Sequence, residues 1–337
     1  MILIITNKED VHPNPVIEIL RQRNIPLFRL NTEALVTDYE LSWYSDKMGE
    51  YFVITNTVTG LTLHSRDITA VWERRPEVPV AESGNYVSKH IAKHNSQEAI
   101  EFLSYFLHFL GLTTNRIIGN HFYEKGASSK LYQLHIARIL ADEYSIKLPN
   151  TIFSNSQSDI LKFSKHKESL IIKSLDGSGF IDEDTLQEYT FYGTKIKPDD
   201  LSRLPMKAFN QTINFIEDYI EKDFELRITC VDNQIFACKL NSRDLPADKG
   251  GVDWRQGIEN GIQYEKFCLP DPISTFCLKY LEKMSLHFGC FDFIVTPEGD
   301  YVFLECNPNG QWLWIEEETG LPISKAIADY LTGELPA

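Results

Sequence analysis

Two carboxylates stand near the ends of one predicted β-hairpin close to the carboxyl end of the chain. The segment FDFIVTPEGDYVFLECN contains Asp292 and Glu305. A four-residue turn at 297–300, closed by Thr296 and Tyr301, places these two acids directly opposite each other. Like charges opposed across a ladder destabilise a sheet, so the pairing makes sense chiefly when a cation lies between them.

Asn307 adds a third oxygen ligand to this pair. It follows Glu305 by two residues, so the two side chains share one face of the strand. Carboxylate and amide oxygens suit Mg²⁺, and Mg²⁺ in turn suggests phosphate. The segment therefore indicates either a magnesium site or a surface hairpin with solvated acids and a different register.

A lysine and a glycine-containing turn form a candidate phosphate site upstream. Lys173 ends the apolar strand Leu170–Lys173, and Gly177, Ser178 and Gly179 follow it. Glycines let backbone N–H groups approach phosphate oxygens, and a neighbouring lysine neutralises their charge. The segment matches neither a Walker loop nor a Rossmann fingerprint, so an ordinary hairpin turn is the alternative.

A short extended link, Glu217-Asp218-Tyr219-Ile220, joins two predicted α/β blocks. Free backbone groups in such a hinge can recognise the edge of an adenine. Glu225 and Arg227 follow, two residues apart on one strand face, where an acid could bind ribose and a guanidinium could bind phosphate. The alternative is a surface ion pair, and Lys239 falls on the opposite face and is left out of the site.

Two arginine motifs could bind a substrate carboxylate or a phosphate. Arg255 lies in the loop motif Asp253-Trp254-Arg255, and its fork could bind an oxyanion bidentately. Arg74 and Arg75 end an amino-terminal strand just before a proline. Each arginine either grips an anion or is simply solvated. Arg74, Arg75 and Asp253 are expected to contact the substrate.

The elements that must position these residues alternate in type along the chain. An apolar strand at 1–6, an amphipathic helix at 15–23 and a strand at 25–30 predict a parallel sheet in a small α/β domain that ends near residue 115. Further strands are predicted around Thr59-Gly60, and QEAIEFLSYFLHFL at 97–110 predicts a core helix. Ser128-Ser129 caps a helix over 130–143, and 181–207 is predicted to be an exposed excursion.

Composition excludes several classes of protein. The formal net charge of −15 over 337 residues argues against general nucleic-acid binding. The 6 cysteines form no CxxC pair and have apolar neighbours, which predicts reduced core residues, and the histidines lack zinc-site spacing. No signal peptide and no membrane-spanning run are visible, so we expect a soluble cytoplasmic protein that needs no membrane.

The ordered set of lysines, hinge, acid-x-arginine and Asp…Glu-x-Asn resembles the ATP-grasp ligases. The resemblance covers roughly residues 115–320 and is carried by KLYQLHIARILADEYSIKLPNTIFSN, LIIKSLDGSGF, IEDYIEKDFELRI and FDFIVTPEGDYVFLECNPNGQWLW. Within that superfamily, LECNPNGQWLWIEEETGLPI, the DWR motif and the double arginine are similar to the peptide maturases of microviridins and other graspetides. Two departures are Cys306, where a small aliphatic residue is usual, and the absence of Asn-Pro in IIGNHFYEKGASS.

This resemblance implies an α/β (α+β) architecture: an ATP-grasp fold behind an N-terminal pre-ATP-grasp α/β domain. The expected domains are 1–115, 116–214 and 215–337. It implies that Lys130 and Lys173 contact phosphates, that the Asp218 and Tyr219 backbone meets adenine and that Glu225 binds ribose. It further implies Mg²⁺ on Asp292, Glu305 and Asn307, with Arg227 and Arg255 stabilising the transferring phosphoryl group and the acyl phosphate.

The implied activity is macrocyclisation of a precursor peptide that has a leader and a core. ATP would activate an Asp or Glu side chain, and Ser, Thr or Lys would attack it to give an ester or an amide. A homodimer is what the family suggests. A ligase that adds glutamate to a protein or small molecule shares every nucleotide and metal residue, and a catalytically silent ATP-binding scaffold is a third hypothesis.

Overall fold

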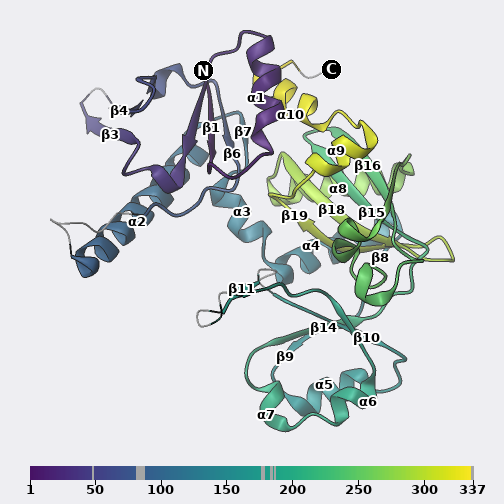
Figure 1. Cartoon of the computed structure of the whole chain (residues 1–337). Coiled ribbons are helices and arrows are strands. Elements are labelled where there is room, and N and C mark those ends of the chain that lie inside the picture. Colours follow the sequence, from purple (N-terminus) through teal and green to yellow (C-terminus); the bar gives the residue numbers. More distant parts are fainter. Residues whose placement is uncertain (48, 81–87, 176–178, 183–184, 186, 335–337) are drawn as a thin grey trace.

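The amino-terminal unit contains the parallel sheet that the sequence predicts. Its strands run in the order β2-β1-β6-β7, and helix α1 connects β1 to β2. The elements are β1 (Ile2–Thr6), α1 (Pro13–Gln22), β2 (Leu27–Asn31), β6 (Ala70–Glu73) and β7 (Ile117–Ile118). Helix α1 begins with proline and buries Val16, Ile17 and Leu20 along one stripe, which holds it against the sheet. Figure 1 shows the chain as a computed structural model that describes residues 1–47, 49–80, 88–175, 179–182, 185 and 187–334.

A second, antiparallel sheet belongs to the same unit. It contains β3 (Tyr39–Asp46), β4 (Gly49–Asn56) and β5 (Thr62–His64), and the predicted turn at Thr59-Gly60 joins the last two. Helix α2 (Lys89–Thr113) extends beyond the predicted 97–110. Its Phe106 packs edge-to-face on Phe52 of β4, with ring centroids 4.9 Å apart, so the aromatic load of this helix is core packing as expected.

The central unit is a four-stranded sheet in the order β13-β10-β14-β9. Its elements are β9 (Thr151–Ser154), α5 (Gln157–Ser164), β10 (Leu170–Lys173), β13 (Thr194–Ile196), α6 (Pro198–Ser202), α7 (Met206–Phe209) and β14 (Asn214–Asp218), with a small hairpin of β11 (Phe180–Ile181) and β12 (Glu188–Tyr189). Strand β14 pairs with both β9 and β10, so the expected boundary at 214 falls one strand too early. The predicted excursion at 181–207 is also partly wrong, since β13 joins the sheet and Leu201 is buried in its core.

The carboxyl-terminal unit is built on a six-stranded sheet in the order β17-β16-β15-β18-β19-β8. Its elements are β15 (Phe224–Val231), β16 (Gln234–Asn241), β17 (Gln263–Lys266), α8 (Asp271–Met284), β18 (Phe288–Val295), β19 (Tyr301–Asn307), α9 (Leu313–Thr319) and α10 (Ile323–Thr332), with short 3-10 helices at Ala247–Lys249 and Trp254–Asn260. Three earlier elements precede the central unit, namely α3 (His121–Ala127), α4 (Lys130–Tyr144) and β8 (Ile146–Lys147). Helix α4 packs on α8 and β8 pairs with β19, so most of this segment belongs to the carboxyl-terminal unit and not to the expected central one.

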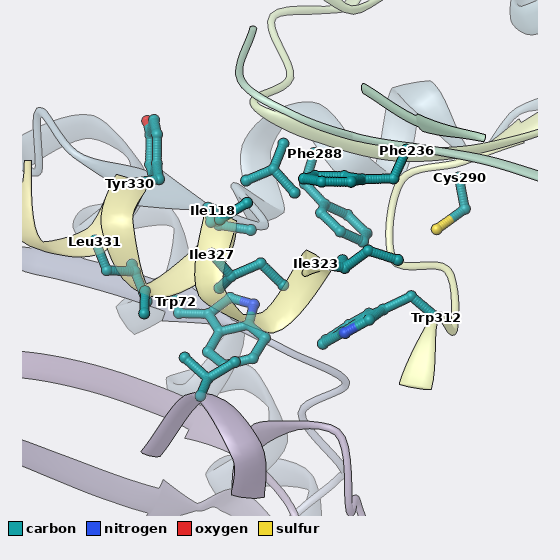
Figure 2. Close-up of a cluster of buried hydrophobic side chains, with 14 of the residues drawn as sticks. Trp72, Ile118, Phe236, Phe288, Cys290, Trp312, Ile323, Ile327, Tyr330 and Leu331 are labelled. Atoms are coloured by element: carbon teal, nitrogen blue, oxygen red, sulfur yellow. The ribbon is translucent and has the colours of Figure 1, made fainter. Parts of the chain in front are cut away.

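The first and last units share one hydrophobic core. Trp72 of β6 and Ile327 of α10 are packed in the same cluster as Phe288 and Trp312, as Figure 2 shows. Trp72 and Trp312 are 1% and 0% exposed, and their ring centroids are 5.9 Å apart. Because a continuous apolar core resists sliding, this packing fixes the amino-terminal unit against the sheet that contains β18 and β19.

All 6 cysteines are free. Five are buried as predicted, whereas Cys268 is exposed, so the core position expected for that residue was wrong. Within the described part of the chain, no helix combines the length and apolar character needed to cross a membrane.

The β18–β19 hairpin confirms the predicted pair but corrects the predicted turn. Asp292 lies opposite Glu305, yet Val295 and not Thr296 lies opposite Tyr301. A bulge between Asp292 and Phe293 makes up the one-residue difference, since Phe293 pairs with Phe303 and Leu304 is the extra residue. The turn is one residue longer than predicted and the bulge adds one residue to β19, so the two differences cancel and Asp292 still lies opposite Glu305.

Candidate active site

A cleft of about 780 Å³ lies where the three units meet. Most of the residues singled out in the sequence line it: Arg75, Lys130, Lys173, Glu217, Asp218, Tyr219, Ile220, Glu225, Arg227, Asp253, Arg255, Asp292, Glu305 and Asn307. Arg74 and Gly179 are not among its lining residues, and Gly177 and Ser178 lie outside the described residues. The cleft therefore brings together side chains from segments more than 200 positions apart.

The two opposed acids each face a cation supplied by the protein. Asp292 Oδ2 accepts a hydrogen bond of 2.7 Å from Arg227 Nη1, and the two residues are also neighbours across the β15–β18 ladder. Glu305 forms an ion pair with Lys130, the first residue of α4, whose preceding Ser129 caps that helix. These contacts offset part of the repulsion between the acids.

The electrostatics of the two acids differ because their surroundings differ. Burial raises the pKa of Asp292, and the nearby Glu305 charge acts in the same direction, although Arg227 opposes it. Burial would also raise the pKa of Glu305, but Lys130, and to a smaller extent Lys173 and Arg227, bring that pKa below its ordinary value. Glu305 is thus an anion throughout the physiological range.

These residues fit Mg²⁺. Asp292 Oδ1 is buried and accepts no hydrogen bond from any described residue. A buried acceptor of this kind is expected to have a partner, and a metal ion would supply one. The described residues contain no group of three or more His, Cys, Asp and Glu side chains arranged for a metal. Mg²⁺ does not need one, because it commonly takes one or two carboxylates and completes its shell with water and phosphate oxygens.

Lys173 forms an ion pair with the buried Glu217 beside this site. Lys173 Nζ lies 2.6 Å from Glu217 Oε2, and Thr151 Oγ1 donates to Glu217 Oε1 at 3.0 Å. Burial alone would lower the pKa of Lys173, but Glu217 outweighs that effect and raises it, so the lysine remains a cation. Glu217 was predicted as a hinge residue, and its carboxylate instead holds the candidate phosphate-binding lysine.

The hinge backbone is used differently from the prediction. The N–H of Asp218 donates to the Asn150 carbonyl at 3.0 Å, and the N–H of Tyr219 donates to the Ser169 carbonyl at 3.3 Å. Neither N–H group is therefore free to donate to an adenine. Of the predicted hinge residues, Ile220 is the one whose backbone N–H would have to make that contact. The Asp218 carboxylate accepts from Asn150 Nδ2 at 2.6 Å and pairs with Lys167.

Glu225 is a buried carboxylate with two partners that sequence reasoning missed. Lys222 Nζ donates to its Oε2 at 2.8 Å, and the Ser242 hydroxyl bonds the same oxygen. Burial raises the pKa of Glu225, although Lys222 and Ser242 oppose the shift. Both bonds reach Oε2, so Oε1 is the oxygen suited to a ribose hydroxyl. Lys222 lies two residues after the hinge motif and three before Glu225, so this short spacing was the signal in the sequence for their pairing.

Asp253 orients Arg255, and Asp253 also bonds the backbone of the central unit. Arg255 Nε donates to Asp253 Oδ1 at 2.8 Å and its Nη2 bonds the other oxygen. Asp253 Oδ2 also accepts the Gly193 N–H at 2.9 Å, and the Arg255 guanidinium lies over the Tyr192 ring, 5.7 Å from its centroid. Asp253 therefore positions Arg255, where we had expected it to contact substrate.

The paired arginines have different environments. Arg75 lines the cleft in a left-handed backbone conformation (φ 49°), and its carbonyl accepts from Asn7 Nδ2 at 2.9 Å. Arg74 is 1% exposed and points into the interface between the first and last units, so its expected contact with substrate does not fit the structure. At position 179, packing alone requires a glycine, because a Cβ there would lie 1.8 Å from the Tyr189 carbonyl oxygen.

Comparisons with known proteins agree with this architecture. A comparison with curated proteins found no match. One similar solved structure is a RiPP-associated ATP-grasp ligase of Chryseobacterium gregarium in complex with ADP and a leader and core peptide; it has 24% identity and a TM-score of 0.88, and the match covers 99% of this chain and 97% of that chain. A second is the macrocyclase MdnC of Microcystis aeruginosa MRC bound with precursor peptide MdnA, with 24% identity, a TM-score of 0.82 and coverage of 98% of this chain and 99% of that chain. A third is the macrocyclase MdnB of the same organism, with 25% identity, a TM-score of 0.75 and coverage of 98% of each chain.

Two family models cover nearly the whole chain. The MvdD pre-ATP-grasp domain matches residues 1–117, and the RimK-like ATP-grasp domain matches residues 128–331. The predicted fold class is confirmed by both matches and by the solved structures. The chain therefore belongs to the RimK-like ATP-grasp ligases, with a pre-ATP-grasp domain of the MvdD type in front of the catalytic fold.

Proposed function

We propose that this ATP-grasp ligase macrocyclises a ribosomally made precursor peptide, joining Asp or Glu side chains to Ser, Thr or Lys. The observation that carries the proposal is the cleft itself, in which Lys130, Lys173, Asp292 and Glu305 converge beside Arg75 of the amino-terminal unit. The likeness along almost the whole chain to ligases solved with leader, core or precursor peptides supports the choice of substrate.

The nucleotide is proposed to lie between the central and carboxyl-terminal sheets. Ile220 would contact adenine, Glu225 would accept from ribose, and Lys130 and Lys173 would neutralise the phosphates. Asp292, Glu305 and Asn307 would hold Mg²⁺, which supplies charge for the transfer of the terminal phosphoryl group to the peptide carboxylate. Because Lys130 pairs with Glu305 in the structure, Mg²⁺ and this lysine would share that carboxylate or the lysine would turn toward phosphate.

The arginines are proposed to stabilise the negative charge that develops as the activated carboxyl group is attacked. Arg227 is buried and tied to Asp292, and Arg255 is fixed by two bonds to Asp253, so neither side chain must reorganise during the reaction. Such preorganisation is the main source of electrostatic catalysis. Arg75 is suited to the substrate carboxylate, because it lines the cleft and comes from a different unit.

The test is mass spectrometry of a leader-and-core peptide from the same genomic neighbourhood after incubation with the enzyme, ATP and Mg²⁺. Each ring formed removes one water from the peptide, so we expect losses of whole water molecules that depend on ATP. An unchanged peptide together with ADP release stimulated by free glutamate would refute the proposal in favour of a glutamate-adding ligase. No ADP release with any substrate would instead favour the silent scaffold. A homodimer in the cytoplasm belongs to the same proposal, and light scattering of the purified chain tests the oligomeric state.

A further inference from the structure

The turn that follows β19 is held from two directions by arginines. We call residues 307–312 the metal-side turn, because they begin with Asn307. Arg74 Nη1 donates to the carbonyl and to Oδ1 of Asn309, both at 2.6 Å, and to the carbonyl of Gly310 at 3.2 Å. Arg227 Nη2 donates to the carbonyl of Gln311 at 3.2 Å. Consecutive carbonyls of one turn thus accept from guanidinium groups of the first and the last unit.

Arg74 is itself fixed firmly enough to serve as an anchor. Its side chain is 1% exposed, and its Nε lies 3.1 Å from Asp10 Oδ2. The guanidinium also lies over the Trp312 ring, 5.0 Å from the centroid, and Figure 2 shows Trp312 in the core shared by the two units. Asp10 is in turn held by His12, whose backbone N–H donates to Asp10 Oδ1 at 3.0 Å. A guanidinium in such a place is costly to bury unless its partners are well arranged.

The contact continues from Asn309 to the proposed metal ligand. The backbone N–H of Asn309 donates to Asn307 Oδ1 at 2.9 Å, which sets the rotation of the Asn307 amide. From the other side, Asn309 Nδ2 reaches Glu124 Oε2 at 3.5 Å. Asn309 is therefore clamped by Arg74 and Glu124, and the orientation of Asn307 depends on that clamp.

We propose that Arg74 is a positioning residue for the metal site, so that the pre-ATP-grasp unit helps to shape the magnesium shell without touching substrate or metal. The inference rests on the proposed role of Asn307 and deepens it. A guanidinium can serve three acceptors on the turn and Asp10 at the same time, whereas an ammonium cannot span that set. Partners that orient metal ligands commonly contribute about 10–100-fold to metal affinity.

The alternative is that Arg74 only joins two units, and a matched control separates the two roles. Arg23, the residue that follows α1, is also an arginine that bridges these units, with 2.7 Å to Asp329 and 2.9 Å to Glu334, but it lies away from the metal-side turn. Arg23→Gln removes a bridge between units while leaving Asn307 and Asn309 untouched. A general loosening of the interface would affect both arginine variants alike.

The experiment measures Mn²⁺ binding to the full chain in the presence of ADP, by electron paramagnetic resonance of free Mn²⁺, for wild type, Arg74→Lys, Asn309→Ala and Arg23→Gln. We expect about 10-fold or greater weakening for Arg74→Lys and a smaller weakening for Asn309→Ala, with wild-type affinity for Arg23→Gln. If Arg74→Lys does not fold, Asn309→Ala and the control decide. Wild-type Mn²⁺ affinity in Asn309→Ala and in any folded Arg74→Lys, or equal weakening in Arg23→Gln, would overturn the proposal.

This assay contains no peptide, so its outcome is independent of the macrocyclase proposal. If the peptide is never cyclised but the Arg74→Lys effect is present, the positioning role stands and the substrate assignment falls. If peptide is cyclised and Mn²⁺ affinity is insensitive to Arg74, the reverse holds. For active variants, the required Mg²⁺ concentration should rise more than the KM for peptide, which a purely structural role would not produce.

Discussion

Gly310 lies in the metal-side turn at a place where even one methyl group has no room. A Cβ there would lie 2.4 Å from Cys290 Cβ, 2.6 Å from Cys290 Sγ and 2.9 Å from Arg227 Nη2. An ordinary contact begins near 3.4 Å, so the turn must move by 3.4 − 2.4 = 1.0 Å or β18 must yield. Cys290 is fully buried and pairs with Asn307 across the ladder, which makes the turn the part that moves.

We predict that Gly310→Ala lowers both stability and turnover. Overpacking of this kind costs about 1–3 kcal/mol of unfolding free energy. A shift of about 1 Å in a positioning element can reduce turnover by about 100-fold, a factor that equals about 2.7 kcal/mol of transition-state stabilisation. The measurements are thermal unfolding and the rate of ATP-dependent water loss from the peptide.

Gly126→Ala is the matched control for this substitution. Gly126 lies within helix α3, and a Cβ there meets nothing within 4 Å. Alanine should therefore stabilise the helix by up to about 1 kcal/mol without affecting turnover. If Gly310→Ala melted and reacted like the wild type, the close approach of the metal-side turn to β18 would be wrong.

The remaining predictions concern charges in and around the cleft. Glu305→Ala should abolish ring formation with the fold retained, because a metal ligand is lost; circular dichroism and peptide mass check this, and a wild-type rate would refute the metal assignment. Lys173→Met should destabilise the chain by about 3–5 kcal/mol, because Glu217 stays buried without its partner. Adding Glu217→Gln should restore part of the melting temperature. ADP binding, measured by calorimetry, should stay weak in both variants. Glu124→Gln should gain stability relative to wild type as pH rises. Burial and Glu73 raise the pKa of Glu124 well above its ordinary value. The contribution of Glu124 to the free energy of unfolding is therefore fully present below about pH 4.3, the ordinary pKa of a glutamate, and is lost as the pH rises. Gln does not titrate, so the variant has no such loss. Melting curves from acidic to alkaline buffer test the sign, and a constant difference between the two proteins would contradict it. Finally, chelation of Mg²⁺ should stop ring formation, and added Mn²⁺ should restore it, because both ions take the oxygen ligands found here.

Local pattern was enough to predict much of the site. Alternation along β15 and β19 placed Glu225 with Arg227, and Glu305 with Asn307, because side chains of one strand face share a period of two. The opposition of Asp292 to Glu305 was also correct, but the turn that gave this answer was wrong by one residue and the bulge at Leu304 compensated. A bulge depends on twist and packing of the whole sheet, and a pairing rule applied to one hairpin cannot detect it.

The hinge and the paired arginines show where pattern fails. The sequence identified an extended link at 217–220, but not that the Asp218 and Tyr219 N–H groups bond the carbonyls of Asn150 and Ser169. Likewise, two adjacent arginines have the same local signal, yet Arg74 is buried between units and Arg75 lines the cleft. Which of two neighbouring side chains is buried depends on what packs against the strand end.

The sequence by itself determined the element types, the faces of the strands, the order of the chemical groups and, through them, the ATP-grasp family. Only the tertiary structure decided how those groups are paired. Lys130 reaches Glu305 across 175 positions and Arg74 reaches Asn309 across 235, and neither contact has a local signal. Local geometry is fixed by backbone periodicity and capping, whereas contacts between distant segments exist only after separate cores have closed around them.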